Sequence, residues 1–311
     1  MSATTEPKLH ILAFTDGTSR SGKVIRSAAR LVAAHPNSAL DILCVMPATP
    51  TPEGEDLSPS TPIPQALWPD LPAGLRHLAT DVLSWLAAEN LCTIPDEISY
   101  MEASGDFQRL NLESCQRPIR IWLTHEDANT AIVSMVEHSS PDLVMIRAAK
   151  TSILGRFLGR DLPASLAMQL PCNLLVVRHG IYPDSKFVLC SDDSDSAKRA
   201  FGVMRKIAPA LRQPVDTLVN EGQDPTQLQD WLAQRNLRGE ILTMPAGSED
   251  PAHEIMLRMR PDQVLVLGAS MRNYILRKFH GTVPMALIRR APCSVLLSKE
   301  LPDKTDQEAA N

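Results

Sequence analysis

The sequence predicts an α/β protein of two tandem Rossmann-like domains, each an open five-stranded parallel sheet flanked by helices. Short continuous apolar runs alternate with amphipathic helical patterns, which is typical of parallel βαβ units. Each half opens with a strand followed by an aspartate, Asp16 or Asp192, and closes with a Pro-Cys pair before a last apolar run. The two closing units lie 121 residues apart, and this fixed spacing indicates one supersecondary unit used twice.

The first half contains apolar runs that are short enough for buried strands, at residues 9–14, 40–46, 119–123, 143–146 and 174–177. Helical patterns fall between them, at residues 24–32, 75–91 and 129–137 and in a last helix that Asp161 would cap. Two insertions separate these elements. The proline-rich segment 48–72 is expected to be an extended loop, and for the polar segment 93–118 the sequence predicts no defined structure.

The second half repeats this order without the two insertions. Its strands are expected at residues 187–190, 215–219, 240–242, 264–267 and 294–297, and its helices at 197–211, 227–237, 252–259 and 284–290. We therefore expect one domain at residues 1–180, a second at 184–300 and a polar tail at 301–311. In such sheets ligands bind beyond the carboxyl ends of the strands, where the strand order reverses.

Composition and charge exclude several classes of protein. The net charge is -5 and the pI is about 5.9, so no binding to nucleic acid is expected. No apolar run approaches the ~20 residues that cross a bilayer, and residues 1–8 lack a signal-peptide core, which predicts a cytoplasmic protein without membrane contact. The six cysteines show no ligand spacing and are expected to be reduced and mostly buried.

The sequence shows no pattern of catalytic or metal-binding residues. Its histidines form neither HxxxH nor HExxH, and Ser19 and Ser194 lack a GxSxG elbow. We therefore predict no metal site and a binding protein rather than an enzyme. Slow nucleotide hydrolysis with Asp192 as the base stays an alternative. The Arg289-Arg290 pair is expected to be a solvated helix face.

Two parts of the chain resemble the universal stress protein family. Asp16-Gly17-Thr18 follows the first strand, and the segment from Gly268 to Leu297 is similar to the nucleotide loop of that family, Gly-x-x-Gly, nine residues, then Gly-Ser or Gly-Thr. The chain is identified as a tandem member with two such domains. The resemblance implies a stress-response regulator whose loop contacts the phosphates and ribose of ATP, with magnesium as an accompanying ion.

In the second half, the resemblance implies a nucleotide site at Asp192, Val219, Gly268, Met271, Arg272, Gly281 and Thr282. Three of the four family loop positions are kept, whereas Met271 replaces the second glycine. Glycine lets backbone N–H groups approach a phosphate, and Thr282 can cap the helix that follows. Competing interpretations stay open for Asp192, as a turn or helix-cap residue, and for Val219, as a core valine.

In the first half, the equivalent positions are Asp16, Val45, Arg147, Lys150, Arg160 and Asp161. Side chains replace all three glycines, and Asp161 puts a carboxylate where a phosphate would lie. Two negative charges at about 4 Å repel by about 1 kcal/mol even in water. We therefore predict that this half binds no triphosphate in the family manner. Its basic side chains are expected to pair with Asp161 or with acidic groups of a partner. As for Asp192 and Val219, the alternatives stay open that Asp16 is a turn or helix-cap residue and that Val45 is a core valine.

Two hypotheses about function follow. The first is a cytoplasmic regulator that binds ATP or another adenine nucleotide in its second half. The alternative is a nucleotide-free interaction scaffold that acts through an unidentified protein partner. The family resemblance also implies that the last strands, 174–177 and 294–297, pair to form an intramolecular pseudo-dimer, and that the chain can form a homodimer.

Overall fold

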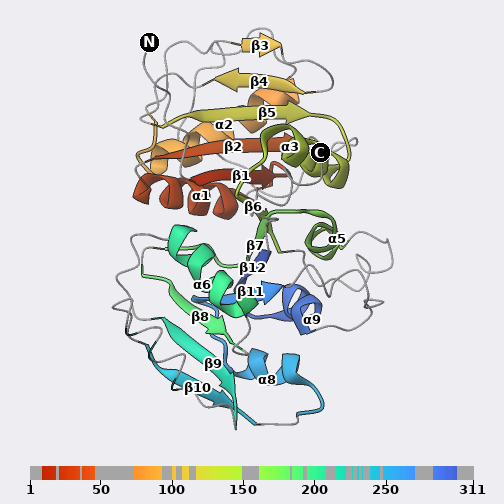
Figure 1. Ribbon diagram of the computed structural model, residues 1–311. Helices are drawn as coiled ribbons and strands as arrows, with labels where there is room; N and C mark the ends of the chain where they lie inside the picture. Colours follow the sequence, from red (N-terminus) through yellow and green to blue (C-terminus); the bar gives the residue numbers. More distant parts are fainter. Residues whose placement is uncertain are drawn as a thin grey trace, which may run out of the picture.

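The computed structural model describes residues 9–18, 21–35, 37–45, 73–92, 100–102, 107–111, 117–148, 161–182, 184–191, 195–207, 215–221, 226, 230, 233, 239–245, 248–269 and 283–299. Their strands form one 12-stranded sheet in the order β10-β9-β8-β11-β12-β7-β6-β1-β2-β5-β4-β3 (Figure 1). The strands are β1 (Leu9–Thr15), β2 (Ser38–Val45), β3 (Tyr100–Glu102), β4 (Gln108–Asn111), β5 (Ile119–Thr124), β6 (Leu143–Arg147), β7 (Asn173–Val177), β8 (Lys186–Cys190), β9 (Asp216–Asn220), β10 (Ile241–Met244), β11 (Gln263–Ala269) and β12 (Ser294–Lys299).

Each half of the sheet contains five parallel strands, which confirms the predicted fold class. The first half runs β7-β6-β1-β2-β5 and the second runs β10-β9-β8-β11-β12. In both halves the first strand lies in the middle, between the second and the fourth strands of the repeat. The inner strands β1 and β2 are buried on both faces, as expected for a parallel sheet that is covered by helices on each side.

The first half carries two strands that the sequence did not predict. β4 pairs antiparallel with β5, and β3 pairs antiparallel with β4, so a hairpin from the 93–118 insertion extends the sheet at its edge. In β4 the buried Leu110 alternates with the polar Arg109, whose guanidinium lies 5.5 Å from the Trp122 ring. A strand that buries one side chain in two has no continuous apolar run, and for this reason the sequence pattern gave no signal.

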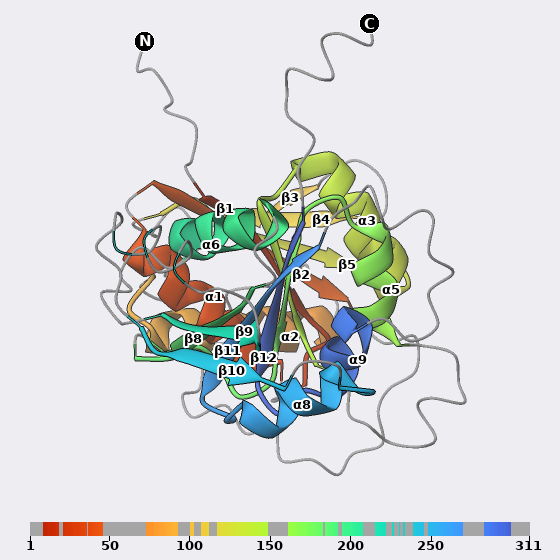
Figure 2. The same ribbon diagram turned by 60° about the horizontal axis from the view of Figure 1, so that its bottom comes forward.

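Two layers of helices cover the sheet. The described helices are α1 (Gly22–Ala34), α2 (Ala73–Ala88), α3 (Ala128–Ser139), α5 (Leu162–Gln169), α6 (Asp195–Ile207), α8 (Pro251–Arg258) and α9 (Val283–Arg290). One core cluster joins α1, α2 and α6 to the sheet, and the other joins α3, α5, α8 and α9 (Figure 2). No helix within the described residues is long and apolar enough to span a membrane.

Most predicted elements begin and end within a few residues of the observed ones. α2 ends at Ala88, whereas the prediction continued to Leu91, and Asn90 there has a positive φ of 56°. α6 is described to Ile207, and the rest of its predicted range lies outside the described residues. The same is true of most of the predicted helix 227–237, the loop 48–72 and the tail 301–311.

The two halves of the sheet join through an antiparallel pair of strands, β7 and β12. Leu174 lies opposite Leu297, and Val176 lies opposite Val295. This register confirms the prediction that the last strands of the two repeats pair with each other. It also relates the repeats by an approximate twofold axis, because each strand meets its own counterpart.

Two cations make reciprocal contacts across this junction. The N–H of Arg178 donates to Ser294 Oγ, and the N–H of Lys299 donates to Asn173 Oδ1, each at 3.1 Å. Arg178 Nη2 donates to the Ile288 carbonyl in the last turn of α9 at 2.6 Å, and Lys299 Nζ donates to a carbonyl just beyond α5. Each repeat thus places a cation at the negative end of the other repeat's last helix.

Burial shapes the ionisation of the groups at the junction in the same way on both sides. It lowers the pKa of Lys299 to about 8, against a smaller opposite effect of Cys172. It also lowers the pKa of Arg178, against a smaller effect of Cys293. Burial raises the pKa of both thiols to about 11. Neither thiol is therefore a thiolate at neutral pH.

The connection between the halves is fastened to the first half. Arg30 on α1 lies over the Tyr182 ring at 4.4 Å and donates to the Ile181 carbonyl at 3.1 Å. Glu89 holds the same guanidinium through two hydrogen bonds of 2.8 and 2.6 Å. The N–H of Ile181 donates to Ser27 Oγ at 2.9 Å. These contacts fix the path of the chain as it enters the second half.

Candidate functional site

The candidate site is the edge where the first and fourth strands of a repeat end side by side. β1 pairs with β6 in the first half, and β8 pairs with β11 in the second, both in parallel. The second strand of each repeat lies on the other side of the first, so the strand order reverses at this point. Open α/β sheets bind ligands at such a switch point. The two edges are equivalent and can be compared residue by residue.

Asp16 shapes the turn that follows β1. Its Oδ1 accepts hydrogen bonds from the N–H of Thr18 at 3.2 Å and from the Thr18 hydroxyl at 2.7 Å. Gly17 has a φ of 77°, and a Cβ there would lie 2.9 Å from the Leu78 side chain, so this turn favours glycine. Ser21 precedes α1 as its N-cap. Asp16 is therefore a turn residue and not the cap of that helix.

Arg147 ends β6 and extends to the same turn. Its Nη2 lies 3.9 Å from Asp16 Oδ2, and the two side chains are 27% and 39% exposed. Arg147 was expected to pair with Asp161 or with acidic groups of a partner; among the described residues it pairs with Asp16, because neighbouring strand ends bring the two side chains together. At this separation and exposure the pair stabilises the fold by at most about 1 kcal/mol. It nevertheless places two charged side chains at the switch point of the first half.

Asp161 caps α5, as predicted. Its Oδ1 accepts a hydrogen bond from the N–H of Ala164 at 3.3 Å, and Pro163 occupies the first turn. Its Oδ2 pairs with Nε of Arg289, which lies in the last turn of α9. The Arg289 side chain is 47% exposed, which agrees with the predicted solvated helix face, but the sequence did not predict its ion pair with Asp161. α5 and α9 lie side by side across the junction (Figure 1), and this brings the end of one helix to the start of the other.

Several predicted site residues lie outside the described residues, namely Lys150, Arg160, Asp192, Met271, Arg272, Gly281 and Thr282. Gly268 is described, and it lies in β11 opposite Ser298, at the position that Arg147 has in the first half. It is partly exposed. Val219 and Val45 are both buried in the core clusters. Among the described residues, the second-half edge is thus formed by the strands β8 and β11 and by the start of α9.

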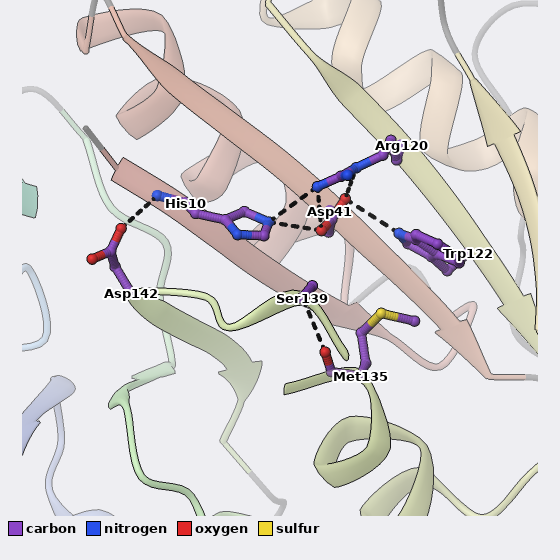
Figure 3. Close-up of polar contacts among 7 residues, drawn as sticks. All are labelled: His10, Asp41, Arg120, Trp122, Met135, Ser139 and Asp142. Carbon is purple, nitrogen blue, oxygen red and sulfur yellow. Dashed lines mark hydrogen bonds and ion pairs between the residues drawn. The ribbon is translucent and has the colours of Figure 1, made fainter. Parts of the chain in front are cut away.

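A separate polar cluster lies within the first half, on β1, β2 and β5 (Figure 3). The fully buried Asp41 lies 2.7 Å from His10 Nε2, and it accepts hydrogen bonds from Arg120 Nε at 2.6 Å and from Trp122 Nε1 at 3.2 Å. Burial alone would raise the pKa of Asp41, but the hydrogen bond from His10 and the charge of Arg120 lower it below its ordinary value. The sequence analysis missed this cluster. An aspartate within an apolar strand is the signal that could have found it.

Asp142 connects this cluster to the second half. Its Oδ2 accepts the N–H of His10 at 2.8 Å, as Figure 3 shows, and its Oδ1 pairs with Lys206 Nζ on α6 at 2.6 Å. Asn173 on β7 donates to the Asp142 carbonyl at 2.7 Å. Because the Asp41 carboxylate is fully enclosed, we assign the cluster a structural role and place no ligand there.

Other groups that could carry chemistry give no site. Within the described ranges, no three or more His, Cys, Asp or Glu side chains are arranged to hold a metal ion. The described cysteines are free thiols, and all except Cys190 are buried.

Comparison with known proteins places the chain in a family. A family model described as the universal stress protein family matches residues 9–178. A universal stress protein from Archaeoglobus fulgidus has a similar structure, with a TM-score of 0.57 at 13% identity over 96% of this chain and 98% of that one. Two proteins from Pseudomonas aeruginosa, one functionally unknown, give TM-scores of 0.53 and 0.54 at 13% and 12% identity, over 94% of this chain and 92% and 93% of theirs. No curated protein matches the sequence.

Proposed function

The chain belongs to the universal stress protein family, and on this premise we propose that it is a cytoplasmic regulatory protein that binds ATP or another adenine nucleotide in its second half. Gly268, Gly281 and Thr282 would hold the phosphates, and Asp192 would face the ribose. Met271 and Arg272 belong to the same loop, and Val219 lies in β9, the second strand of this half. Magnesium would accompany the nucleotide. The proposal includes no catalytic step.

The contrast between Gly268 and Arg147 carries this proposal. In the first half, Arg147 faces Asp16, and Asp161 is paired with Arg289, so charged side chains surround the switch point. In the second half the same strand position holds a glycine, which leaves the backbone accessible to a phosphate. α9 begins directly after Gly281-Thr282, and a helix start offers free N–H donors to an anion.

Equilibrium dialysis with labelled ATP tests the proposal. Gly281→Arg gives the second half the residue that the first half has as Arg160, and it should lower the affinity at least about tenfold, because a side chain then fills the phosphate position. The matched control is Gly202→Arg on the exposed face of α6, where an added Cβ meets nothing within 4 Å. Absence of binding at millimolar ATP, or equal losses in both variants, would contradict the proposal.

The second candidate function is the nucleotide-free scaffold. The ion-paired switch point of the first half favours it, together with the β3–β4 hairpin that extends the sheet beyond β5. This hypothesis expects no ATP binding by either half and a stable complex with a protein partner in sedimentation experiments. Nucleotide binding that is lost in Gly281→Arg would rule it out as the sole function.

A further inference from the structure

We propose that β10, the strand at one end of the sheet, docks against β10 of a second copy of this chain, and that the Arg258 side chain closes this edge in the monomer. The strand order ends at β10, which lies at the outer end of the second half (Figure 1). Three features of the molecule support this docking: the backbone groups of β10, the burial of its side chains, and the strand that covers the equivalent edge of the first half.

The backbone groups of β10 alternate between the sheet and its free edge. The carbonyls of Glu240 and Met244 accept hydrogen bonds from β9, at 2.8 and 2.6 Å. Since successive residues of a strand direct their N–H and carbonyl groups to opposite sides, those of Ile241 and Thr243 face away from β9. No strand of the described chain pairs with them. The next outward position is Pro245, which has no N–H, so the free donors end there.

In the first half, a strand covers the equivalent edge. β5 is the third parallel strand of its repeat, as β10 is, and β4 pairs with it in the antiparallel direction. The register places Ile121 and Leu123 of β5 at the positions of Ile241 and Thr243. Ile121 and Leu123 are at most 1% exposed, whereas Ile241 is only partly buried and Thr243 is exposed. The second repeat lacks the insertion that supplies β4, so a strand that covers β10 has to come from elsewhere.

A second β10 fits this edge when the two strands run antiparallel about a twofold axis at Leu242. Ile241 of each copy then lies opposite Thr243 of the other, and their outward N–H and carbonyl groups pair with one another. The two Leu242 side chains, each only partly buried in the monomer, meet at the axis. Glu240 lies opposite Met244, so no like charges face each other. The chain already joins its own halves in this way, because β7 and β12 pair antiparallel about an approximate twofold axis.

Arg258 occupies an acceptor that this pairing needs. Its Nε donates to the Thr243 carbonyl at 3.3 Å, and its Nη1 donates to Glu254 Oε2 on the same helix at 2.7 Å. A charged side chain at the free edge of a sheet opposes the addition of another strand. The hydrogen bond to Thr243 is longer than usual, so the N–H of Ile241 from a second copy can replace it. One weak contact thus closes the edge of the monomer.

Analytical ultracentrifugation of the full chain over a range of concentrations tests this surface. We expect a reversible dimer whose dissociation constant falls about five- to thirtyfold in Arg258→Ala, because a competing donor is removed from both copies. The matched control is Arg260→Ala, which removes the same charge from a side chain that is 61% exposed and should change the constant less than about twofold. Thr243→Pro removes an N–H that β9 does not use and should abolish the dimer.

Two results of this experiment would overturn the proposal. One is a wild type and an Arg258→Ala variant that both stay monomeric at about 100 μM. The other is a dimer that persists in Thr243→Pro, because the contact would then lie on another surface. Equal effects of Arg258→Ala and Arg260→Ala would remove the role given to Arg258. A dimer that forms only in Arg258→Ala supports an edge that the arginine closes.

A cysteine at the axis gives a second test, which does not require Thr243→Pro to fold. In the proposed pairing, the two residues at position 242 form a non-hydrogen-bonded pair with Cα atoms about 4.5 Å apart, within the range of a disulfide. Leu242→Cys should therefore crosslink to a dimer on mild oxidation. Thr243→Cys should crosslink at least about tenfold more slowly, because diagonal neighbours lie about 7–8 Å apart. Wild type measures the background from the native thiols. No crosslink at position 242, or equal rates for the two variants, would contradict the axis at Leu242.

Discussion

Asp41 and Asp216 occupy equivalent positions in the two halves, as their register with β1 and β8 shows, yet their surroundings differ. Asp41 is enclosed by His10 and Arg120, and the Arg120 guanidinium matches its negative charge. Asp216 is also buried, but its Oδ1 accepts a hydrogen bond from the backbone N–H of Glu240 at 3.1 Å, where the first half has Arg120. At equivalent positions of the fold, a buried carboxylate can thus take its hydrogen-bond donors from side chains or from the backbone.

The switch points repeat this difference. In the first half the charges of Asp16 and Asp161 are met by arginines of the protein itself, Arg147 and Arg289. In the second half Gly268 stands in the place of Arg147, and Met168 corresponds to Arg289. One repeat therefore pairs its charged side chains with each other at this edge, whereas the other has an uncharged residue, Gly268 or Met168, at the positions of the two arginines.

The largest expected difference concerns the two buried acids. Asp41→Asn removes one partner of a buried ion pair and should cost about 3 kcal/mol of unfolding free energy. Asp216→Asn keeps an oxygen that can accept the same N–H and should cost less than about 1.5 kcal/mol. Urea unfolding at neutral pH measures both. The excess cost at Asp41 should shrink as the pH falls through its lowered pKa, because protonation removes the same charge. Equal losses of unfolding free energy in the two variants would contradict the proposed difference between the two buried acids.

A second prediction compares the two cations at the junction. The pKa of Lys299 is about 8 in the folded chain, against an ordinary value of 10.5. Between these values the unfolded chain binds more protons, so this lysine makes stability rise with pH, by up to about 3 kcal/mol in total. Lys299→Arg, which copies Arg178, should abolish that contribution because arginine does not titrate there.

The buried cysteines affect the same measurement with the opposite sign. Their pKa values are raised to about 11, so their contribution falls as pH rises above the ordinary thiol value. The Lys299 contribution is therefore measured as the difference between wild type and Lys299→Arg in urea unfolding from pH 7.5 upward. Parallel pH profiles for the two proteins would contradict the lowered pKa.

The smallest expected effect concerns the ion pair between α5 and α9. Arg289→Met gives α9 the residue that α5 has at this position, and it should cost less than about 1 kcal/mol, since the paired side chains are 47% and 37% exposed. The matched control is Arg290→Met, which removes the same charge from an exposed neighbour with no ion pair among the described residues. Thermal unfolding at low and high salt should show a salt-dependent difference between the two variants. Identical unfolding curves at both salt concentrations would mean that the pair contributes nothing to stability.

The repeat made most of the fold predictable from the sequence. The fixed spacing of Pro171 and Pro292 placed the last strands, and the resemblance that it supported gave their pairing across the junction. The capping role of Asp161 was also predictable, because it depends on residues that are close in sequence. These inferences share one property, which is that local sequence or internal repetition carries the information.

The contacts that could not be predicted from the sequence join residues that are far apart in the chain. Arg289 finds Asp161 only because α5 and α9 meet at the junction, and no local pattern shows this. The hydrogen-bond partners of Asp41, Arg120 and His10, lie on other strands, so in the sequence this aspartate is only an exception within an apolar run. For the second-half site the sequence supplied the spacing of the glycines, and the structure places one of them, Gly268, near the end of β11.

The position of β12 has a consequence for how the chain is made. It is the last described strand in sequence, yet it lies near the middle of the sheet, between β11 and β7. While the ribosome is still producing the second repeat, β7 exposes an unpaired edge of apolar residues. An edge of this kind can accept the same strand from another nascent chain. By pairing β12 with β7, the second repeat therefore also protects the first repeat against strand exchange, and it can do so only once β12 has been synthesised.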